Sequence, residues 1–297
     1  MSIKTGGCPE DCGYCSQSSK HKAGTGLAAT KLASLEEVFA AAERAKAAGS
    51  TRFCMGAAWR GPSQVGVGQF ERVLEMTRRI RGLGLEVCAT LGMLEGDQAA
   101  QLRAAGLTAY NHNLDTSEEH YGRISSTRAY ADRLATLARV RDAGISVCCG
   151  GILGLGEAPA DRVALLTTLA TLPQHPESVP INALVAVKGT PLQDAPPVQA
   201  LDLVRAIAAA RVVMPRAVVR LSAGRVAFSP ADQALCFLAG ANSVFAGDTL
   251  LTTPNNPASA DAAMFAALGL EGRPAFLPYA GGGASSASFP EAAVARG

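Results

Sequence analysis

The feature that most constrains the fold is an alternation of short β-rich runs with amphipathic helical segments along most of the chain. Hydrophobic periodicity predicts parallel strands separated by roughly 30 to 40 residues, the length of a βα unit. The candidate strands are 2–5, 52–57, 86–91, 109–114, 146–152, 179–187, 218–222 and 243–245. The candidate helices are 34–48, 69–83, 96–105, 127–143, 159–172, 197–214 and 230–239.

Eight βα units predict an α/β fold with a (β/α)8 TIM-type barrel, whose active site lies at the C-terminal ends of the strands. A doubly wound open sheet is the alternative. Ser34 and Glu37 form a capping-box pattern, and Pro159 and Pro230 suit the first turn of a helix. No low-complexity linker interrupts the series. We therefore expect one barrel over 1–253 and a C-terminal extension over 254–297, flexible near its Gly/Ser-rich stretch at 281–286.

Charge and hydropathy limit the partners. The 27 basic and 25 acidic residues are scattered without long runs, so no electrostatic footprint for nucleic acid or an acidic membrane is present. No apolar run approaches the roughly 18 residues of a membrane span, and no signal-peptide core follows Met1. Eight cysteines are too sparse for a secreted disulfide scaffold. We expect a cytoplasmic protein that acts on a small molecule.

Three cysteines, Cys8, Cys12 and Cys15, are spaced C-x3-C-x2-C directly after the first candidate strand. An iron-sulfur cubane normally takes four cysteines, so three would leave one iron of a 4Fe-4S cluster open to a small molecule. Structural zinc with His21 as fourth ligand is an alternative, although zinc sites usually pair their ligands and no second pair follows. Disulfide pairing is a further alternative.

The spacing, with Tyr14 before the last cysteine, resembles the cluster loop of the radical S-adenosylmethionine (SAM) enzymes. The full segment CPEDCGYCSQSS resembles the biotin synthase family within that superfamily, and the resemblance runs almost continuously from residue 2 to about 257. It implies a barrel of the radical SAM kind and a SAM-binding 4Fe-4S cluster held by Cys8, Cys12 and Cys15. Family members carry roughly a few dozen residues before the segment SIKTG, so we expect a truncated first strand, either in a natural short form or because a segment is missing.

A second group of cysteines lies in the candidate strands: Cys54, Cys88 and Cys148, with Arg220 in a later strand. Side chains that point into a barrel meet in shared layers, although a lone buried cysteine is usually a small hydrophobe. The segments FCMGAAW, LEVCATLG, ISVCCGGI and VRLSAGR resemble those with which the family holds a 2Fe-2S cluster, which makes these four residues its implied ligands.

Other cysteines, and the unusual arginine, have simpler interpretations. Arginine is normally protonated, so the alternative for Arg220 is a hydrogen bond to a sulfide or a carboxylate. Cys149 should point to the opposite face of its strand from Cys148. Cys236, in a helical segment, is predicted to pack in the core.

The implied SAM contacts also follow from family segments. Residues 150–157 resemble the GxIxGxxE segment that supports the adenine, whereas glycines alone would predict only a turn. The turn after the second strand stands where the family usually has a Gly-Gly-Glu-like contact to the methionyl amine. The resemblance also implies that Tyr14 lies near the adenine. It implies an Asp at the ribose and an Arg at the methionyl carboxylate. The residues are Tyr14, Gly56, Ala57, Asp115, Arg133, Gly150, Ile152, Gly154 and Glu157.

The segment YNHNLDTS resembles a family segment whose first Asn after the His binds the ureido group of the substrate, here Asn113. Asn and Asp also end strands routinely, which is the alternative. Asn182 matches a second ureido contact, and Thr252 and Thr253 match contacts to the substrate carboxylate. His112 is predicted to be a structural residue whose hydrogen bonds are satisfied.

The resemblance implies conversion of dethiobiotin to biotin: a 5′-deoxyadenosyl radical removes hydrogen and the 2Fe-2S cluster supplies sulfur. No side chain is predicted to be catalytic beyond these cofactors. A reduced flavodoxin or ferredoxin is the implied electron donor, and a homodimer the implied assembly. Two alternatives stay open: a related radical SAM enzyme without sulfur insertion, and an iron-sulfur sensor or carrier.

Overall fold

The computed structural model describes residues 1–247 and 249–276. Its main element is a parallel sheet in the order β1-β2-β3-β4-β5-β7-β8-β9, with β6 paired to β7. The eight predicted strands are all present, and because one of them is divided in two the sheet has nine strands among the described residues. They are β1 (Ser2–Lys4), β2 (Arg52–Ala57), β3 (Glu86–Thr90), β4 (Ala109–Asn111), β5 (Ser146–Cys148), β6 (Gly151–Leu153), β7 (Ser178–Ala183), β8 (Val218–Leu221) and β9 (Ser243–Val244).

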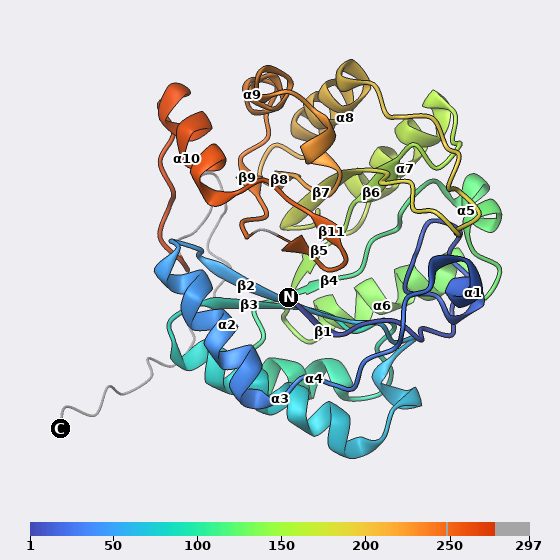
Figure 1. Cartoon of the computed structure of the whole chain (residues 1–297), viewed down its shortest axis with the longest axis vertical. Helices are drawn as coiled ribbons and strands as arrows, with labels where there is room; N and C mark the ends of the chain where they lie inside the picture. Colours follow the sequence, from blue (N-terminus) through green and yellow to red (C-terminus); the bar gives the residue numbers. More distant parts are fainter. Residues whose placement is uncertain (248, 277–297) are drawn as a thin grey trace.

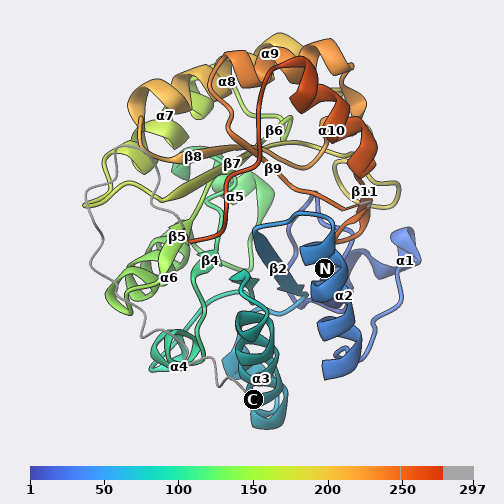
Figure 2. The same cartoon turned by 90° about the vertical axis from the view of Figure 1, so that its left-hand side faces the viewer.

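The sheet curls as a TIM-type barrel, with its helices on the outside (Figures 1 and 2). In the part of the chain that is described, β1 and β9 each pair with one strand and not with each other, so the barrel is open on that side. The predicted α/β barrel class is confirmed, and the sheet is open only between its first and last strands.

The helices that cover the sheet follow the predicted segments within a few residues. Ser34 and Glu37 form the capping box, and Pro159 and Pro230 begin their helices. The covering helices are α2 (Leu35–Ala47), α3 (Val67–Gly82), α4 (Gln98–Ala104), α6 (Tyr130–Asp142), α7 (Pro159–Ala170), α8 (Ala200–Val213) and α9 (Pro230–Leu238). Short turns are η1 (Ser19–His21), α1 (Lys22–Thr25), η2 (Pro62–Gln64) and η3 (Arg225–Ala227).

Two segments differ from the prediction. The strand expected at 146–152 is divided into β5 and β6, because Gly150 lies against β7 so closely that a Cβ there would be 1.9 Å from the Pro180 carbonyl oxygen. The helix expected at 127–143 begins later, and a separate helix, α5 (Glu118–Ile124), precedes it, capped by the Ser117 hydroxyl. The loop between α5 and α6 becomes part of the candidate site.

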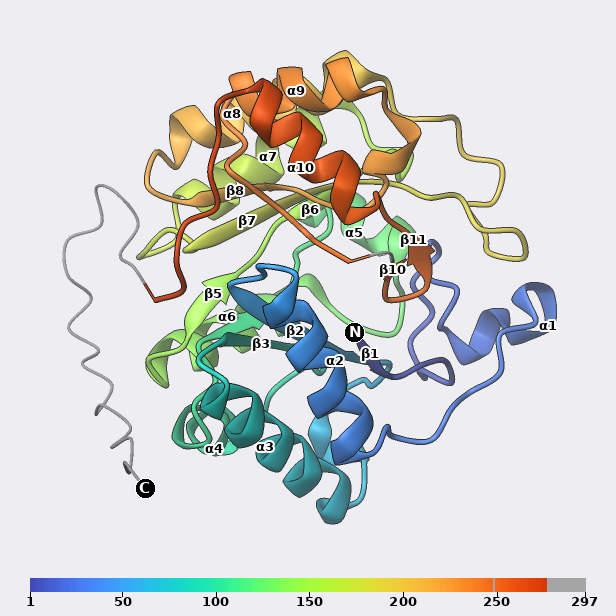
Figure 3. The same ribbon diagram turned by 60° about the vertical axis from the view of Figure 1, so that its left-hand side comes forward.

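The chain after β9 forms a hairpin, β10 (Thr249–Leu250) with β11 (Thr253–Pro254), and a helix, α10 (Ala258–Ala267). Figure 3 shows the hairpin on the open side of the sheet, between the first strands and the last. Arg225, which is 1% exposed, makes two 2.6 Å hydrogen bonds to Asp261 and so ties α10 to the barrel. The stretch 281–286 lies outside the described residues.

The hydrophobic core lies between the outer face of the sheet and the helices. Val73 and Ile80 of α3 and Val87 of β3 are fully buried there. Each such side chain contributes about 1.5 to 3 kcal/mol by leaving water. None of the helices described in residues 1–247 and 249–276 is long and apolar enough to cross a membrane.

Candidate active site

A cavity of about 1400 Å³ occupies the inside of the curled sheet. Both groups of cysteines reach it from different directions. Cys8, Cys12 and Cys15 border it from the loop after β1, and Cys54, Cys88 and Cys148 from β2, β3 and β5. The two groups therefore face one interior space.

The loop after β1 is closed by its own backbone. The Cys8 amide donates to the Gln17 carbonyl at 3.0 Å, and the Cys15 amide donates to the Cys12 carbonyl at 2.9 Å. Burial raises the pKa of the Cys15 thiol to about 12. These hydrogen bonds hold the three cysteines on one side of a compact turn.

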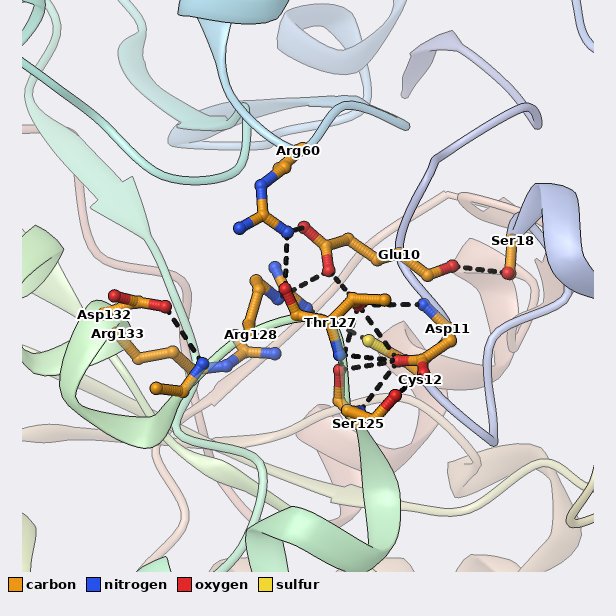
Figure 4. Close-up of polar contacts among 12 residues, drawn as sticks. Glu10, Asp11, Cys12, Ser18, Arg60, Ser125, Thr127, Arg128, Asp132 and Arg133 are labelled. Atoms are coloured by element: carbon orange, nitrogen blue, oxygen red, sulfur yellow. Dashed lines mark hydrogen bonds and ion pairs between the residues drawn. The ribbon is translucent and has the colours of Figure 1, made fainter.

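The same loop is fastened to the α5–α6 loop by two carboxylates, as Figure 4 shows. Asp11 accepts hydrogen bonds from the Ser125 hydroxyl at 3.0 Å, the Ser126 amide at 3.0 Å and the Thr127 hydroxyl at 3.0 Å. Although burial raises the pKa of Asp11, these hydrogen bonds outweigh it and hold that pKa well below its usual range. The loop position thus depends on residues more than a hundred positions away.

Glu10 is the second carboxylate, and it is 2% exposed. It pairs with Arg60 at 2.7 Å and accepts a hydrogen bond from the Thr127 hydroxyl. Arg128 lies on its other side, with Nε 3.5 Å from the Glu10 carboxylate, and donates from Nη2 to the Cys12 sulfur at 3.0 Å. This network was not predicted from the sequence, although Glu10 and Asp11 lie inside the cysteine motif.

The second group of cysteines is placed by the sheet itself. Cys54 and Cys88 are direct partners in the register of β2 and β3. Cys148 accepts contacts from Arg220 Nη1 at 3.7 Å and from Asn111 Nδ2 at 3.2 Å. The structure therefore brings together the three predicted cysteines and Arg220.

The electrostatics of this group favour one thiolate. A hydrogen bond from the Cys88 thiol, the largest influence, lowers the pKa of Cys54 to about 6 in spite of burial. The charges of Arg220 and Arg52 lower it further. The Cys88 pKa is raised well above its ordinary value by the same hydrogen bond and by burial. The positive charges of Arg220 and Arg52 near Cys54 thus favour the thiolate form of that cysteine.

Cys149 and Cys236 lie away from the cavity, as predicted. Both are 1% exposed or less and belong to the apolar core. Burial raises the pKa of Cys149 and that of Cys236 to about 11. Neither thiol therefore faces the cavity.

The donor set can be tested against the groups that it is expected to hold. Among the described residues, no three His, Cys, Asp or Glu side chains converge on a point that would hold a single metal ion. The Nε2 atom of His21 instead contacts the Cys12 carbonyl at 3.2 Å, which is unfavourable to the zinc alternative. A 4Fe-4S cluster is held by cysteine thiolates, so the three thiols that border the cavity match the type of ligand it takes.

Tyr14, Asp115 and Arg133 form a buried polar group at the cavity wall. The Tyr14 hydroxyl donates to Asp115 at 2.9 Å, and Arg133 donates to the same carboxylate at 2.5 Å. Arg133 also donates to the Tyr121 hydroxyl at 2.7 Å. Asp115 has a φ of 68°, a left-handed conformation that is rare for a residue with a side chain and is held here by its backbone bridge to Gly151.

The other residues predicted to contact SAM divide into two sets. Gly56, Ala57 and Ile152 border the cavity. Gly150, Gly154 and Glu157 are not among its lining residues. Gly150 lies between β5 and β6, and Gly154 and Glu157 lie in the turn after β6, where the Gly154 amide donates to Glu157 at 3.0 Å. The Glu157 carboxylate is further engaged by Arg162 at 2.8 Å.

The four residues predicted to contact substrate all border the cavity: Asn113, Asn182, Thr252 and Thr253. The two amides already have partners, since Asn113 Oδ1 accepts from the Gly150 amide at 3.2 Å and Asn182 Nδ2 donates to the Gly151 carbonyl at 2.8 Å. His112 also borders the cavity, and its Nε2 has no hydrogen-bond partner among the described residues, so the prediction that its hydrogen bonds are satisfied is wrong. The strand-ending role proposed as the alternative for Asn113 is therefore compatible with its position in the wall.

Comparisons with known proteins identify the family. A model of the radical SAM superfamily matches residues 2–169, and a model of the biotin and thiamin synthesis associated domain matches residues 180–271. The mitochondrial biotin synthase of Arabidopsis thaliana is 62% identical over 277 residues, which cover 92% of this chain and 72% of that protein. The chain belongs to the biotin synthase family. It is thus a radical SAM enzyme of a family of sulfurtransferases.

A bacterial member of the biotin synthase family, from Methylobacterium sp. (strain 4-46), is 62% identical over 270 residues, or 91% of this chain and 80% of that protein. Among solved structures, methylornithine synthase superposes with a TM-score of 0.77 at 18% identity and covers 92% of this chain and 82% of its own. The hydrogenase maturase of Carboxydothermus hydrogenoformans reaches 0.71 at 16% identity over 94% of this chain and 62% of its own. These structural likenesses support the barrel fold.

Proposed function

We propose that this chain converts dethiobiotin to biotin by radical SAM sulfur insertion. The observation that carries the proposal is the arrangement of two separate cysteine groups around one cavity. Cys8, Cys12 and Cys15 would hold a 4Fe-4S cluster, and Cys54, Cys88, Cys148 and Arg220 a 2Fe-2S cluster. When bound, these clusters and SAM supply the electron, the hydrogen-abstracting radical and the sulfur.

The chain's own residues position and enclose the reactants. Asp115 offers a carboxylate to the ribose hydroxyls of SAM, and Arg133, which already orients that carboxylate, would pair with the methionyl carboxylate. Tyr14, Gly56, Ala57 and Ile152 border the cavity and are proposed to contact SAM directly, whereas Gly150, Gly154 and Glu157 would support the adenine by shaping the chain on either side of β6. The strands around the cavity exclude water from a reaction that proceeds through a radical.

Asn113, Asn182, Thr252 and Thr253 are proposed to bind the ureido group and the carboxylate of dethiobiotin, because all four border the same cavity. Both amides would have to exchange an internal hydrogen bond for one to the substrate. We also retain the barrel over 1–253 with an extension over 254–297, a homodimer, and a reduced flavodoxin or ferredoxin as electron donor. A cytoplasmic location is proposed because eight free thiols suit a reducing compartment.

The test is an anaerobic assay of reconstituted protein with SAM, dethiobiotin and a strong reductant. The proposal expects 5′-deoxyadenosine and biotin in the same reaction. Formation of 5′-deoxyadenosine without biotin, from protein that contains both clusters, would favour a radical SAM enzyme without sulfur insertion. If SAM is not cleaved at all, the radical SAM function itself is wrong.

A further inference from the structure

We propose that Arg128 is a positioning residue that tunes the reduction potential of the cluster bound by Cys8, Cys12 and Cys15. Its guanidinium donates to the Cys12 sulfur and would favour the reduced cluster. This inference deepens the proposed function and rests on its assignment of Cys12 as a cluster ligand.

The contact is made in a buried place. Arg128 Nη2 lies 3.0 Å from the Cys12 sulfur, and the Arg128 side chain is 8% exposed. The sulfurs of Cys8 and Cys15 face backbone amides, those of Glu10 and Gln17. Among these three cysteines of the described loop, Cys12 is the one whose sulfur accepts a hydrogen bond from a cationic side chain, while the charges of Arg128 and Lys4 also reach Cys8.

The guanidinium is not fully neutralised by its carboxylate. Glu10 is shared between Arg60, at 2.7 Å, and Arg128, whose Nε is 3.5 Å away and outside hydrogen-bond geometry. Two arginines therefore compete for one carboxylate. Arg60 has the better contact with Glu10, which leaves positive charge on Arg128 directed at sulfur.

The architecture also fixes Arg128. It follows Thr127, whose hydroxyl is engaged by Glu10 and Asp11, and it immediately precedes the N-cap of α6. Both carboxylates come from the cysteine loop. The network in Figure 4 therefore sets the position of the guanidinium relative to the loop whose sulfur it contacts.

A hydrogen bond from a cation to a ligand sulfur affects the two oxidation states unequally. Reduction adds one negative charge, which is spread partly over the sulfurs, and a charge-assisted hydrogen bond in a low-dielectric site strengthens with that charge. Hydrogen bonds to the sulfurs are among the factors that set the potentials of iron-sulfur clusters. Loss of Arg128 should make reduction less favourable.

The experiment is a redox titration, followed by electron paramagnetic resonance, of reconstituted full-length protein and its Arg128→Gln variant. We expect reduction of the 4Fe-4S cluster to become about tenfold less favourable in the variant, which is about 59 mV for a one-electron couple. Arg128→Lys, which keeps the charge without the planar fork, should give a smaller shift in the same direction. Arg60→Gln is the comparison variant: it removes no contact to a described cysteine sulfur but frees Glu10 to pair more closely with Arg128, so it should lower the potential by less than Arg128→Gln does.

The outcomes separate the two proposals. If Arg128→Gln has the wild-type potential, or if Arg60→Gln shifts it equally, the tuning role is wrong and Arg128 only fastens two loops. If Arg128→Gln does not assemble a cluster, the Glu10→Gln variant tests the tuning role instead. That role predicts a higher reduction potential in Glu10→Gln, because more of the positive charge of Arg128 then faces Cys12. An unchanged or lower potential would refute it. If wild-type protein assembles no 4Fe-4S cluster, the proposed function fails independently.

Discussion

The two cysteine groups border one cavity but are held in different ways. Cys8, Cys12 and Cys15 belong to one loop outside the sheet, and this loop is fastened by Glu10 and Asp11 to a distant loop. Cys54, Cys88 and Cys148 belong to three strands, and the register of the sheet places them. The comparison teaches that the first site depends on contacts outside its own segment, whereas the second is built into the barrel.

The groups also differ electrostatically. Burial raises the pKa of Cys15 to about 12, whereas a hydrogen bond from Cys88 and nearby arginines lower that of Cys54 to about 6. Burial thus dominates the pKa of Cys15, whereas a neighbouring donor and neighbouring charges dominate that of Cys54. If each group holds its own cluster, substitutions in one should leave the other intact.

The largest expected effect is that of Cys12→Ala. It removes one of three proposed ligands of the 4Fe-4S cluster, so SAM cleavage should fall to background while circular dichroism keeps the spectrum of the folded barrel. The 2Fe-2S absorbance should remain, because its ligands lie on strands. Formation of 5′-deoxyadenosine at the wild-type rate would show that the loop has been assigned wrongly.

Cys88→Ala should have the converse effect. We expect loss of the 2Fe-2S absorbance and of biotin formation, with the 4Fe-4S cluster retained, and the same for Cys148→Ala. Cys149→Ala is the matched control, since its thiol lies in the core on the other side of the strand. A Cys149→Ala variant that loses the second cluster while Cys148→Ala retains it would mean that the strand faces have been read the wrong way.

Arg220→Lys should have an intermediate effect. The three thiolates carry the charge that holds iron, so the variant should keep much of the 2Fe-2S cluster and lose roughly tenfold in biotin formation, about the value of one charge-assisted hydrogen bond. Visible absorbance and a biotin assay check this. A loss as complete as that of Cys88→Ala would show that the guanidinium is indispensable to the cluster.

The smallest expected effect is that of Asp11→Asn, and it depends on pH. The pKa of Asp11 is held below its usual range in the folded protein, so the carboxylate stabilises the fold above about pH 4 and this contribution is lost as pH falls through the folded pKa. We expect a loss within about 1 kcal/mol at pH 7, because solvent screens this half-buried group, and a smaller one at pH 3. Thermal melts at both values test it, and a difference that grows on acidification would contradict it.

The sequence predicted the strands well, because alternating and apolar runs report directly on local structure. It also predicted that Cys148 and Cys149 would face opposite sides, since strand geometry alone decides that. Contacts between distant segments were not predictable in this way. No periodicity in the sequence links Glu10 to Arg128. The turn after β6 likewise gave no indication that the Glu157 carboxylate would accept a hydrogen bond from the Gly154 amide and pair with Arg162.

The C-terminal part shows the same limit. The region after 254 has no alternating pattern, and although the Ala-rich sequence of α10 favours a helix, its attachment to the barrel depends on the buried ion pair between Arg225 and Asp261, which no local pattern indicates. Conversely, the division of the strand at Gly150 follows from a close approach to Pro180 of a different strand. Tertiary contacts, more than local propensity, decide these positions.

The most direct test of two independent cluster sites is Mössbauer spectroscopy, with iron and sulfide analysis, of anaerobically reconstituted wild-type, Cys12→Ala and Cys88→Ala proteins. The wild type should contain both a 4Fe-4S and a 2Fe-2S cluster, Cys12→Ala only the latter and Cys88→Ala only the former. Wild-type protein that makes biotin with the iron of a single cluster, or a single substitution that removes both clusters, would contradict the account.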